Sequence, residues 1–201
     1  MSLRRPELEP HHAAALAART AARAAAEGLA EIAYATVDSP VGRLVAVATQ
    51  RGLARLAYEI ENGGLDSVLD DVAARLSPAI VEAPARLDDV RRELDEYFAG
   101  QRHDFELALD WTLVRTPFHR GVLRVTAEIP FGATSTYREI AAAAGSPAAF
   151  RATGNALGAN PIPIVVPCHR VLASGGGLGG YTGGLERKRL LLAIEGGRLA
   201  V

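Results

Sequence analysis

The single cysteine of the chain lies in a segment whose residue types suit nucleophilic chemistry. The segment reads NPIPIVVPCHRV over residues 160–171, and it places Cys168 directly before His169 and Arg170. A cysteine reacts as the thiolate, which nearby cations or a proton acceptor favour. His169 is the candidate base. We expect the thiol to end a strand-like run, where neighbouring side chains point in opposite directions, so that a bridging water connects the two groups.

A carboxylate that orients the imidazole would complete a cysteine–histidine–acid relay. Glu195 is the candidate, because it follows the apolar run Leu190–Ile194 near the end of a predicted helix. The same pattern also fits a helix-end charge that faces solvent. In the same way, a lone cysteine is often a small buried apolar residue. The pattern alone leaves these alternatives open.

A glycine-rich loop follows the thiol. Seven of the eleven residues 174–184 are glycine. Such a loop could cradle a flat ligand with its backbone, or it could simply be flexible. It matches neither the phosphate-binding P-loop nor the dinucleotide-binding GxGxxG unit. Tyr181 and Thr182 supply one aromatic face and one hydroxyl, which suits a pocket for a nucleobase.

The elements that must position these residues divide the chain into three predicted parts. Residues 1–32 are rich in Ala, Arg and Glu and predict an appended helix, in which His11 and His12 are solvated rather than metal ligands. Residues 33–109 predict a small α/β scaffold domain. Its expected elements are about three short strands over 33–59, helices over 65–76 and 87–99, and another short strand over 105–109.

Residues 110–201 predict a mainly helical domain. Thr116-Pro117 begins a helix that reaches about Ile129, and Thr134 or Ser135 caps the next helix over 136–144. A further helix over 148–157 follows Gly145-Ser146-Pro147, which gives a helix-turn-helix outline. The predicted fold class is therefore α/β of the α+β kind. A small N-terminal domain of a β-meander and helices precedes the mainly helical domain.

The second helix of that pair is rich in Ala and Gly. Small side chains let a helix backbone approach a narrow surface, and the minor groove of duplex DNA is about 6 Å wide. Arg151 stands alone among these small residues, where it could insert into a base stack or be a solvated surface arginine. Residues 110–201 carry ten Arg or Lys against five Asp or Glu, although the whole chain has a net charge of -1. A polyanion would therefore meet this part of the chain.

Composition excludes several classes of protein. A chain with 49% hydrophobic and 22% charged residues is globular in type. One cysteine excludes an internal disulfide and a Cys-rich zinc module, and we expect neither a metal nor a cofactor. No uncharged apolar run approaches the ~18 residues of a membrane span. The N-terminus also lacks the apolar run of a signal peptide, so we expect a cytoplasmic location.

Two segments carry a strong resemblance to a known family. NPIPIVVPCHRV and GGYTGGLERKRLLLAIEG resemble the O6-alkylguanine-DNA alkyltransferases, also called methylated-DNA–protein-cysteine methyltransferases, for which Pro-Cys-His-Arg is a specific motif. The resemblance runs from about Ala33 through Gly196 and includes DSPVGRL, EYFAG, TPFHRGVL and IPFGATSTYREIA. It implies an enzyme that flips O6-alkylguanine, and also O4-alkylthymine, out of duplex DNA. The alkyl group then passes irreversibly to its own Cys168, once per molecule.

The resemblance also implies a role for each matching catalytic residue. Cys168 accepts the alkyl group, and His169 takes the thiol proton through a water. Glu195 orients His169, and Asn160 braces the turn that carries the thiol. Tyr137 crowds the adjacent DNA phosphate and protonates the leaving guanine at N3.

Further residues are implied for DNA binding and for the base pocket. Arg151 fills the gap left by the flipped guanine, and other DNA contacts come from the same helix: Ala149, Ala152, Thr153 and Asn155. In the pocket, Tyr181 is the stacking wall, Thr182 donates a hydrogen bond to O6, and Lys188 closes the pocket. Backbone carbonyls near Cys168 and Val171 read the exocyclic amine, and the remaining lining is Pro163 and Gly183. The glycines suggest a roomy pocket.

The sequence departs from the family pattern in two segments. His119 and Leu123 stand where many relatives have Gln and Trp, and we interpret the lost Trp as a change in the core. Gly158-Ala159 precedes Asn160 where many relatives have an extra polar or basic residue, which puts one phosphate contact in doubt.

Two other classes of function remain open from the sequence. One is a non-catalytic module that binds alkylated bases and recruits other repair proteins. The other is a cysteine hydrolase of the Cys-His-acid type, which would need an oxyanion hole and would turn over. We expect the partner to be double-stranded DNA containing O6-alkylguanine. We expect the protein to be a monomer, with cooperative binding along DNA left open.

Overall fold

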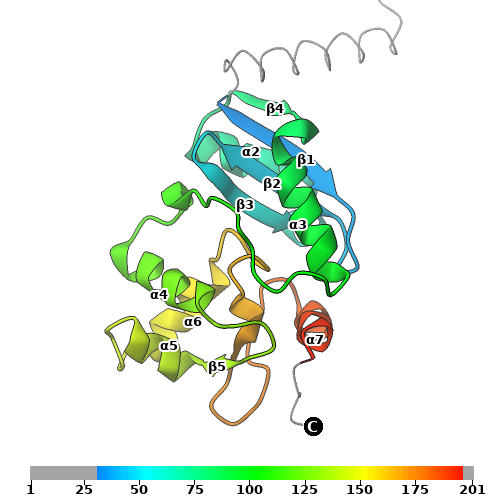
Figure 1. The fold of residues 1–201 in the computed structure, drawn as a ribbon. Helices are drawn as coiled ribbons and strands as arrows, with labels where there is room; N and C mark the ends of the chain where they lie inside the picture. The colour runs from blue at the N-terminus through cyan, green and yellow to red at the C-terminus, as the bar shows by residue number, and fades with distance from the viewer. Residues whose placement is uncertain (1–30, 197–201) are drawn as a thin grey trace, which may run out of the picture.

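The computed structural model describes residues 31–196. Figure 1 shows a sheet with two helices at one end of the molecule and a group of short helices at the other. The helix predicted for the N-terminal extension, with His11 and His12, lies outside the described residues apart from its last two positions. None of the helices within 31–196 is long and apolar enough to cross a membrane.

The N-terminal sheet contains the predicted meander. Strands β1 (Ile32–Val37), β2 (Leu44–Thr49) and β3 (Gly52–Tyr58) pair in antiparallel fashion. The structure adds β4 (Ile80–Glu82), which pairs parallel to β1 and gives the order β3-β2-β1-β4. Strand β4 was not predicted, because a three-residue strand is too short to show a period of two.

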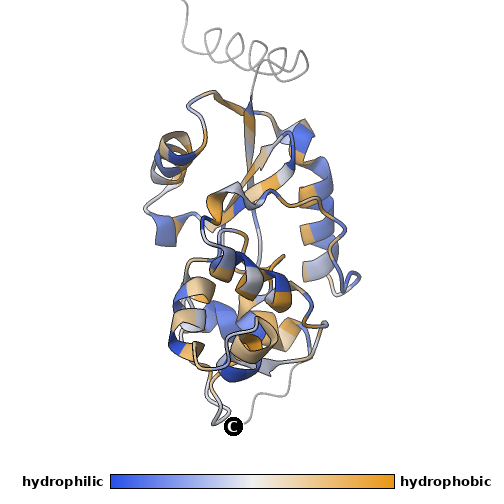
Figure 2. Ribbon diagram, turned by 90° about the vertical axis from the view of Figure 1, so that its left-hand side faces the viewer, coloured by the Kyte–Doolittle hydropathy of each residue, from blue (hydrophilic) through white to orange (hydrophobic). Residues whose placement is uncertain are grey.

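Two helices cover opposite faces of this sheet. Both helices were predicted, with ends that agree within about one residue. Helix α2 spans Leu65–Arg75 and α3 spans Asp88–Phe98, and Figure 2 shows a helix on each side of the sheet. Successive strand residues point to opposite faces. Accordingly, alternate residues of β2 join different clusters: Val45 and Val47 cluster with α2, and Leu44 and Ala46 belong to the main core with α3.

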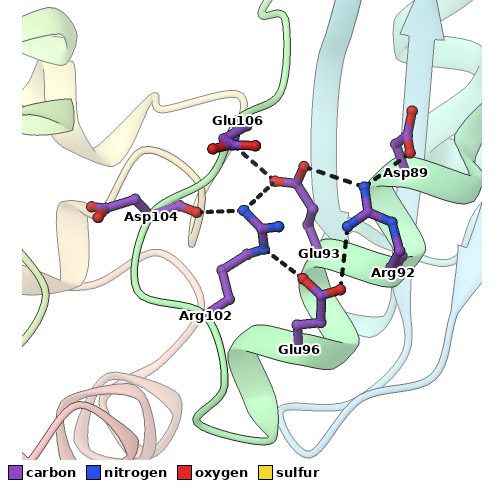
Figure 3. Close-up of polar contacts among 7 residues, drawn as sticks. All are labelled: Asp89, Arg92, Glu93, Glu96, Arg102, Asp104 and Glu106. Atoms are coloured by element: carbon purple, nitrogen blue, oxygen red, sulfur yellow. Dashed lines mark hydrogen bonds and ion pairs between the residues drawn. The ribbon is translucent and has the colours of Figure 1, made fainter.

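The predicted strand over 105–109 is wrong. Only one bridge forms, from Leu109 to Leu53 of β3. The backbone before it is held by a side chain instead, because the buried carboxylate of Glu93 accepts a hydrogen bond from Glu106 N at 2.9 Å. Figure 3 shows Arg102 between Glu93 and Glu96, which fixes the same loop against α3. The Glu93 carboxylate thus takes the place of a strand partner for the N–H of Glu106, while Leu53 of β3 bonds to Ala108 O and Asp110 N.

The C-terminal part is mainly helical, with two boundaries that differ from prediction. Helix α4 (Pro117–Ala127) begins as expected, because the Thr116 hydroxyl caps it. Helix α5 (Tyr137–Ala143) is not capped by Thr134 or Ser135: Thr136 and Glu139 form a capping box. Helix α6 (Phe150–Gly158) begins two residues later than predicted, and α7 spans Leu185–Ile194. Helices α5 and α6 pack together across the predicted turn.

One buried cluster runs from the sheet into the helical part, where it includes Leu123, Ile162 and Leu191. Leu123 has no exposed surface, so the position where many relatives carry Trp is a core position, as interpreted from the sequence. The domain boundaries near residues 32 and 109 stay predictions.

Candidate active site

The segment before the thiol is a compact turn, which corrects the strand expected there. Between residues 160 and 167 the structure has a single bridge, from Pro163 to Val166, and Cys168–Arg170 forms the 3-10 turn η4. Prolines at 161, 163 and 167 remove backbone donors that a strand would need. Strand β6 (Val171–Leu172) follows the thiol and pairs parallel to β5 (Ser135–Thr136). This pairing brings the start of α5 to the thiol.

Asn160 holds that turn together through three hydrogen bonds. Its Oδ1 accepts from Ile162 N at 3.0 Å, and its Nδ2 donates to Val166 O at 2.9 Å and to Cys168 Sγ at 3.2 Å. The turn also contains Ile164 at a φ of 75°, a strained value for a β-branched residue. Asn160 therefore ties a strained backbone directly to the sulfur.

The thiol is buried but borders open space. Cys168 is 8% exposed and lines two cavities of about 360 and 280 Å³. Burial raises the pKa of the Cys168 thiol, while the Asn160 hydrogen bond and the charge of Lys188 oppose the rise. At neutral pH the group is consequently a thiol, and it needs a base when it reacts.

His169 and Glu195 form a buried pair next to the thiol. Nε2 of His169 lies 2.8 Å from Oε1 of Glu195, and both side chains are fully buried. The alternative of a solvent-facing Glu195 is therefore wrong. Burial lowers the pKa of His169, so its imidazole is neutral, and its Nδ1 has no hydrogen-bond partner within residues 31–196. Glu195 stays ionised, because its hydrogen bonds to His169 and Arg170 outweigh burial and bring its pKa to about 2.

Two further residues complete this network, and the sequence analysis missed both roles. Arg170 donates from Nε to Oε2 and from Nη2 to Oε1 of Glu195, each at 2.9 Å. Tyr97 of α3 donates its hydroxyl to Oε1 at 2.7 Å. Arg170 was visible only as part of the motif. Tyr97 lies on the apolar face of the amphipathic helix α3, so the pattern predicts a ring in the core. The pattern does not indicate that the tyrosine hydroxyl has a buried partner.

We expect Tyr97→Phe to lower the free energy of unfolding by about 2 kcal/mol, because it removes a buried hydrogen bond to a charged group. The ring and its contacts with Phe98, Phe105 and Phe131 would remain. Urea unfolding at pH 7 measures the change. Tyr34→Phe, which removes a partly exposed hydroxyl of β1, is the matched control, and equal losses in the two variants would contradict the expectation.

The predicted base-pocket residues lie around the thiol with their polar groups already bonded. The Thr182 hydroxyl, predicted to donate to O6, donates to Gly158 O at 2.7 Å. The Tyr181 hydroxyl lies 2.7 Å from that of Tyr58 in β3, a pocket residue that the sequence analysis missed. Cys168 O accepts from Val171 N. A carbonyl oxygen has a second lone pair, so it could still accept from a base.

Lys188 is fully buried and joins the two sides of the glycine-rich loop. Its Nζ donates to Val171 O at 2.6 Å and also to Leu178 O. Burial lowers the pKa of Lys188 to about 8, and the nearby Cys168 opposes that change. The lysine thus fixes the loop against β6.

Gly183 has a different role from the open space that we inferred from the sequence. A Cβ at this position would lie 2.4 Å from Cε2 of Tyr58 and 2.9 Å from Cε1 of Tyr181. The glycine therefore lets two tyrosine rings approach the backbone closely, rather than enlarging the pocket.

Gly183→Ala should consequently disturb the pocket. We expect the Tyr181 ring to be displaced. The rate of reaction with O6-benzylguanine, a soluble test compound, should fall at least about tenfold, because displacing a group by ~1 Å can lower a rate by more than that. Gly177→Ala is the control, because nothing lies within 4 Å of the Cβ it would add. Equal rates for both variants would contradict the expectation.

The predicted DNA-contacting residues lie on α5 and α6. Tyr137 is half-buried, packs beside Gly154 and donates its hydroxyl to Gly180 O at 3.3 Å. Arg151, Ala152 and Asn155 are exposed, and Ala149 is partly exposed. Thr153 is the exception. It is fully buried on the core face with Ala156 and Leu157, so its side chain is turned away from any groove.

Pro163 and Cys168 also line the larger cavity, whereas Arg151 lines neither cavity. The structure thus brings together Cys168, His169, Glu195, Asn160 and the pocket residues, with Tyr137 at the smaller cavity. Among the described residues, no group of three His, Cys, Asp or Glu side chains could hold a metal ion.

Two family descriptions match this chain. Residues 32–111 match "6-O-methylguanine DNA methyltransferase, ribonuclease-like domain", and residues 117–197 match "6-O-methylguanine DNA methyltransferase, DNA binding domain".

Similar proteins come from bacteria and archaea. The methylated-DNA–protein-cysteine methyltransferase of Mycolicibacterium paratuberculosis is 41% identical over 164 residues, which are 82% of this chain and 92% of the relative. The protein of the same name from Methanosarcina barkeri is 35% identical over 162 residues, 81% of this chain and 96% of the relative.

Solved structures agree in fold. The crystal structure of Mycobacterium tuberculosis O6-methylguanine methyltransferase has a TM-score of 0.70 at 36% identity, over 82% of this chain and 92% of that chain. The crystal structure of Mycobacterium tuberculosis OGT in complex with DNA has a TM-score of 0.69 at 38% identity, over 81% and 92%.

Proposed function

This chain belongs to the 6-O-methylguanine DNA methyltransferase family, and from that membership we propose that it repairs DNA by moving the alkyl group of O6-alkylguanine to the sulfur of Cys168. DNA binding follows from the same membership. One observation carries the assignment of the acceptor. Cys168 lines the cavities and lies next in sequence to a buried His169–Glu195 pair, whose imidazole has one nitrogen without a partner among residues 31–196.

The reaction is an in-line displacement at the alkyl carbon. The sulfur forms a bond to that carbon while the bond from the carbon to O6 breaks, and its electron pair passes to the guanine. The thiol proton moves through a water to Nδ1 of His169. Glu195, 2.8 Å from the other ring nitrogen, stabilises the imidazolium that forms.

Tyr137 is the proposed proton donor to the leaving base. Burial raises the pKa of its phenol, so it stays protonated at neutral pH. Donation to N3 lets guanine leave as a neutral base. The phenolate then recovers a proton from solvent, and the imidazolium of His169 releases the former thiol proton to solvent. The thioether product is stable, so each molecule acts once.

The reacting carbon lies inside a duplex, so the base must first leave the stack, at a cost of a few kcal/mol. The small exposed residues of α6 suit close approach to the minor groove, and Arg151 would fill the gap. O4-alkylthymine presents the same type of carbon, so we propose it as a second substrate. The phosphate contacts should make binding depend on salt.

The decisive experiment is the intact mass of the protein before and after exposure to duplex DNA containing O6-methylguanine. We expect a gain of one methyl group per chain, located at Cys168. DNA binding without a gain in mass would favour a non-catalytic module. Continued release of product with excess substrate would favour a hydrolase.

The pH dependence of transfer tests the role of His169. Since its pKa is lowered, the imidazole is already neutral at pH 6.5, and the wild-type rate should stay nearly flat from pH 6.5 to 7.5, below the Lys188 pKa of about 8. In His169→Gln the thiol must ionise by itself, so the rate should be lower by about 10²-fold or more at pH 7 and rise with pH toward the raised pKa of Cys168. Single-turnover rates with O6-benzylguanine measure this, and a pH-independent variant would contradict it.

The monomeric state and the cytoplasmic location are part of the same proposal. An enzyme that transfers a single alkyl group needs only one thiol and one bound lesion, and it must work where DNA is present. Sedimentation with and without DNA would test the monomer and would detect cooperative binding.

A further inference from the structure

Phe150 is an aromatic residue that the core does not use. It is the first residue of α6 and is partly exposed. The partly buried apolar side chains that pack against the two core clusters do not include it. The ring is therefore partly buried by contacts outside the two core clusters, and part of it remains accessible to solvent.

Two arginines flank the ring. Cζ of Arg138 lies 5.0 Å and Cζ of Arg151 lies 5.7 Å from the ring centroid, within the range of cation–π contacts. Both arginines are exposed, and neither forms an ion pair within residues 31–196. Arg138, Phe150 and Arg151 therefore form a cationic aromatic patch whose arginines have no carboxylate partner in the part of the chain that the structure describes.

The patch lies beside the proposed DNA-contacting residues. Arg138 follows Tyr137 at the start of α5, and α5 packs against α6, as Figure 1 shows. Beyond Arg151, the exposed side of α6 carries small residues such as Ala152. The ring is consequently the largest apolar side chain at the start of this helix.

We propose that the Arg138–Phe150–Arg151 patch is a stacking site for an unpaired nucleobase. The inference rests on the proposed function, which extrudes one nucleotide and leaves its partner base without a pair. Arg151 would fill the position of the extruded purine, and the neighbouring ring would stack on the partner base. The guanidinium group of Arg138 would lie against a flanking phosphate, and a cation beside an aromatic ring is common in sites for unpaired bases.

The test compares the binding of two undamaged duplexes at one salt concentration. The first is fully paired, and the second has an abasic position opposite a cytosine, which supplies the unpaired base without an alkyl group. The wild type should prefer the second duplex by roughly tenfold, in line with base–aromatic stacking. Phe150→Ala should reduce the preference to about twofold or less, and Phe150→Trp should keep it.

Two further variants sharpen the result. Ile60→Ala removes an apolar side chain of the N-terminal part that is 77% exposed, and it should keep the preference of the wild type. Phe150→Leu keeps the apolar volume but not the aromatic face, so it should lose most of the preference. Thermal unfolding checks that each variant is folded.

Full preference in Phe150→Ala or in Phe150→Leu would overturn the stacking site. So would a wild type that binds both duplexes equally. Failure of the proposed function gives a different result, because the wild-type chain would then gain no mass from O6-methylguanine DNA whatever its preference for the abasic duplex.

Discussion

Cys168→Ala is expected to abolish alkyl transfer completely while DNA affinity stays within about twofold of the wild type. The contacts that position a protein on a duplex go mostly to phosphates and sugars, and the proposed contacts come from α5 and α6. Cys168 itself is 8% exposed and contributes only the sulfur. Intact mass after incubation with O6-methylguanine DNA measures transfer, and fluorescence anisotropy with the same duplex measures affinity.

A matched variant separates the loss of the nucleophile from the loss of volume. Cys168→Ser fills the same space and can still accept a hydrogen bond from Asn160, but a hydroxyl is a weak nucleophile unless it is strongly activated. It should also gain no mass. Any methyl gain in Cys168→Ala would place the acceptor at another residue and contradict the mechanism.

Glu195→Gln is expected to lower the free energy of unfolding by about 3–5 kcal/mol, because it leaves the buried guanidinium of Arg170 without its counter-charge. Arg170 contacts Glu195 through two nitrogens, and both residues are at most 4% exposed. The imidazolium of His169 would also lose its counter-ion, so transfer should slow by about 10²-fold or more. Urea unfolding and single-turnover kinetics measure the two effects.

The pH dependence of stability identifies the same carboxylate. Its pKa of about 2 in the folded protein lies below the usual value for Glu in an unfolded chain, near 4.3. A lowered pKa stabilises the folded state above the unfolded value, and that stabilisation is lost as the pH falls toward 2. Between pH 5 and 2 the wild type should therefore lose between about 2 and 3 kcal/mol from this group alone.

Glu195→Gln should lack this part of the acid destabilisation. The control is Glu186→Gln, which removes an exposed carboxylate paired with Arg189 on α7 and should change stability by less than about 0.5 kcal/mol. If the free energies of unfolding of the wild type and Glu195→Gln changed in parallel with pH, the ionised carboxylate of Glu195 would not be the group that the folded protein stabilises.

The local sequence pattern predicts most of the helices and strands. The meander over β1 to β3 follows from β-branched runs broken by turns, and α3 follows from apolar residues at three- and four-residue spacing. The cap of α4 follows from Thr116 before a proline. The pattern failed where one residue of another element decided the backbone. Over 105–109 the backbone pairs with β3 only around Leu53, and the N–H of Glu106 donates to the Glu93 carboxylate instead of to a strand.

The residues of the site divide in the same way, into those that the local sequence indicates and those that only the fold brings in. Cys168 and His169 are neighbours in sequence, so their chemistry could be recognised from the motif, and Glu195 could be suggested from an apolar helix. Tyr58 and Tyr97 could not be found in this way, because each meets the site from the N-terminal part of the chain. The hydroxyl of Tyr97 reaches Glu195 across 98 positions of sequence.

The sequence by itself determined which chemistry is available: one sulfur, an adjacent imidazole, a candidate carboxylate and an arginine on a helix of small residues. The tertiary structure decided the charge that each group carries. A pKa depends on burial and on partners within a few ångströms, and here those partners come from α3, the thiol turn and the end of α7. For that reason a neutral imidazole and an ionised Glu195 became evident only in the folded chain.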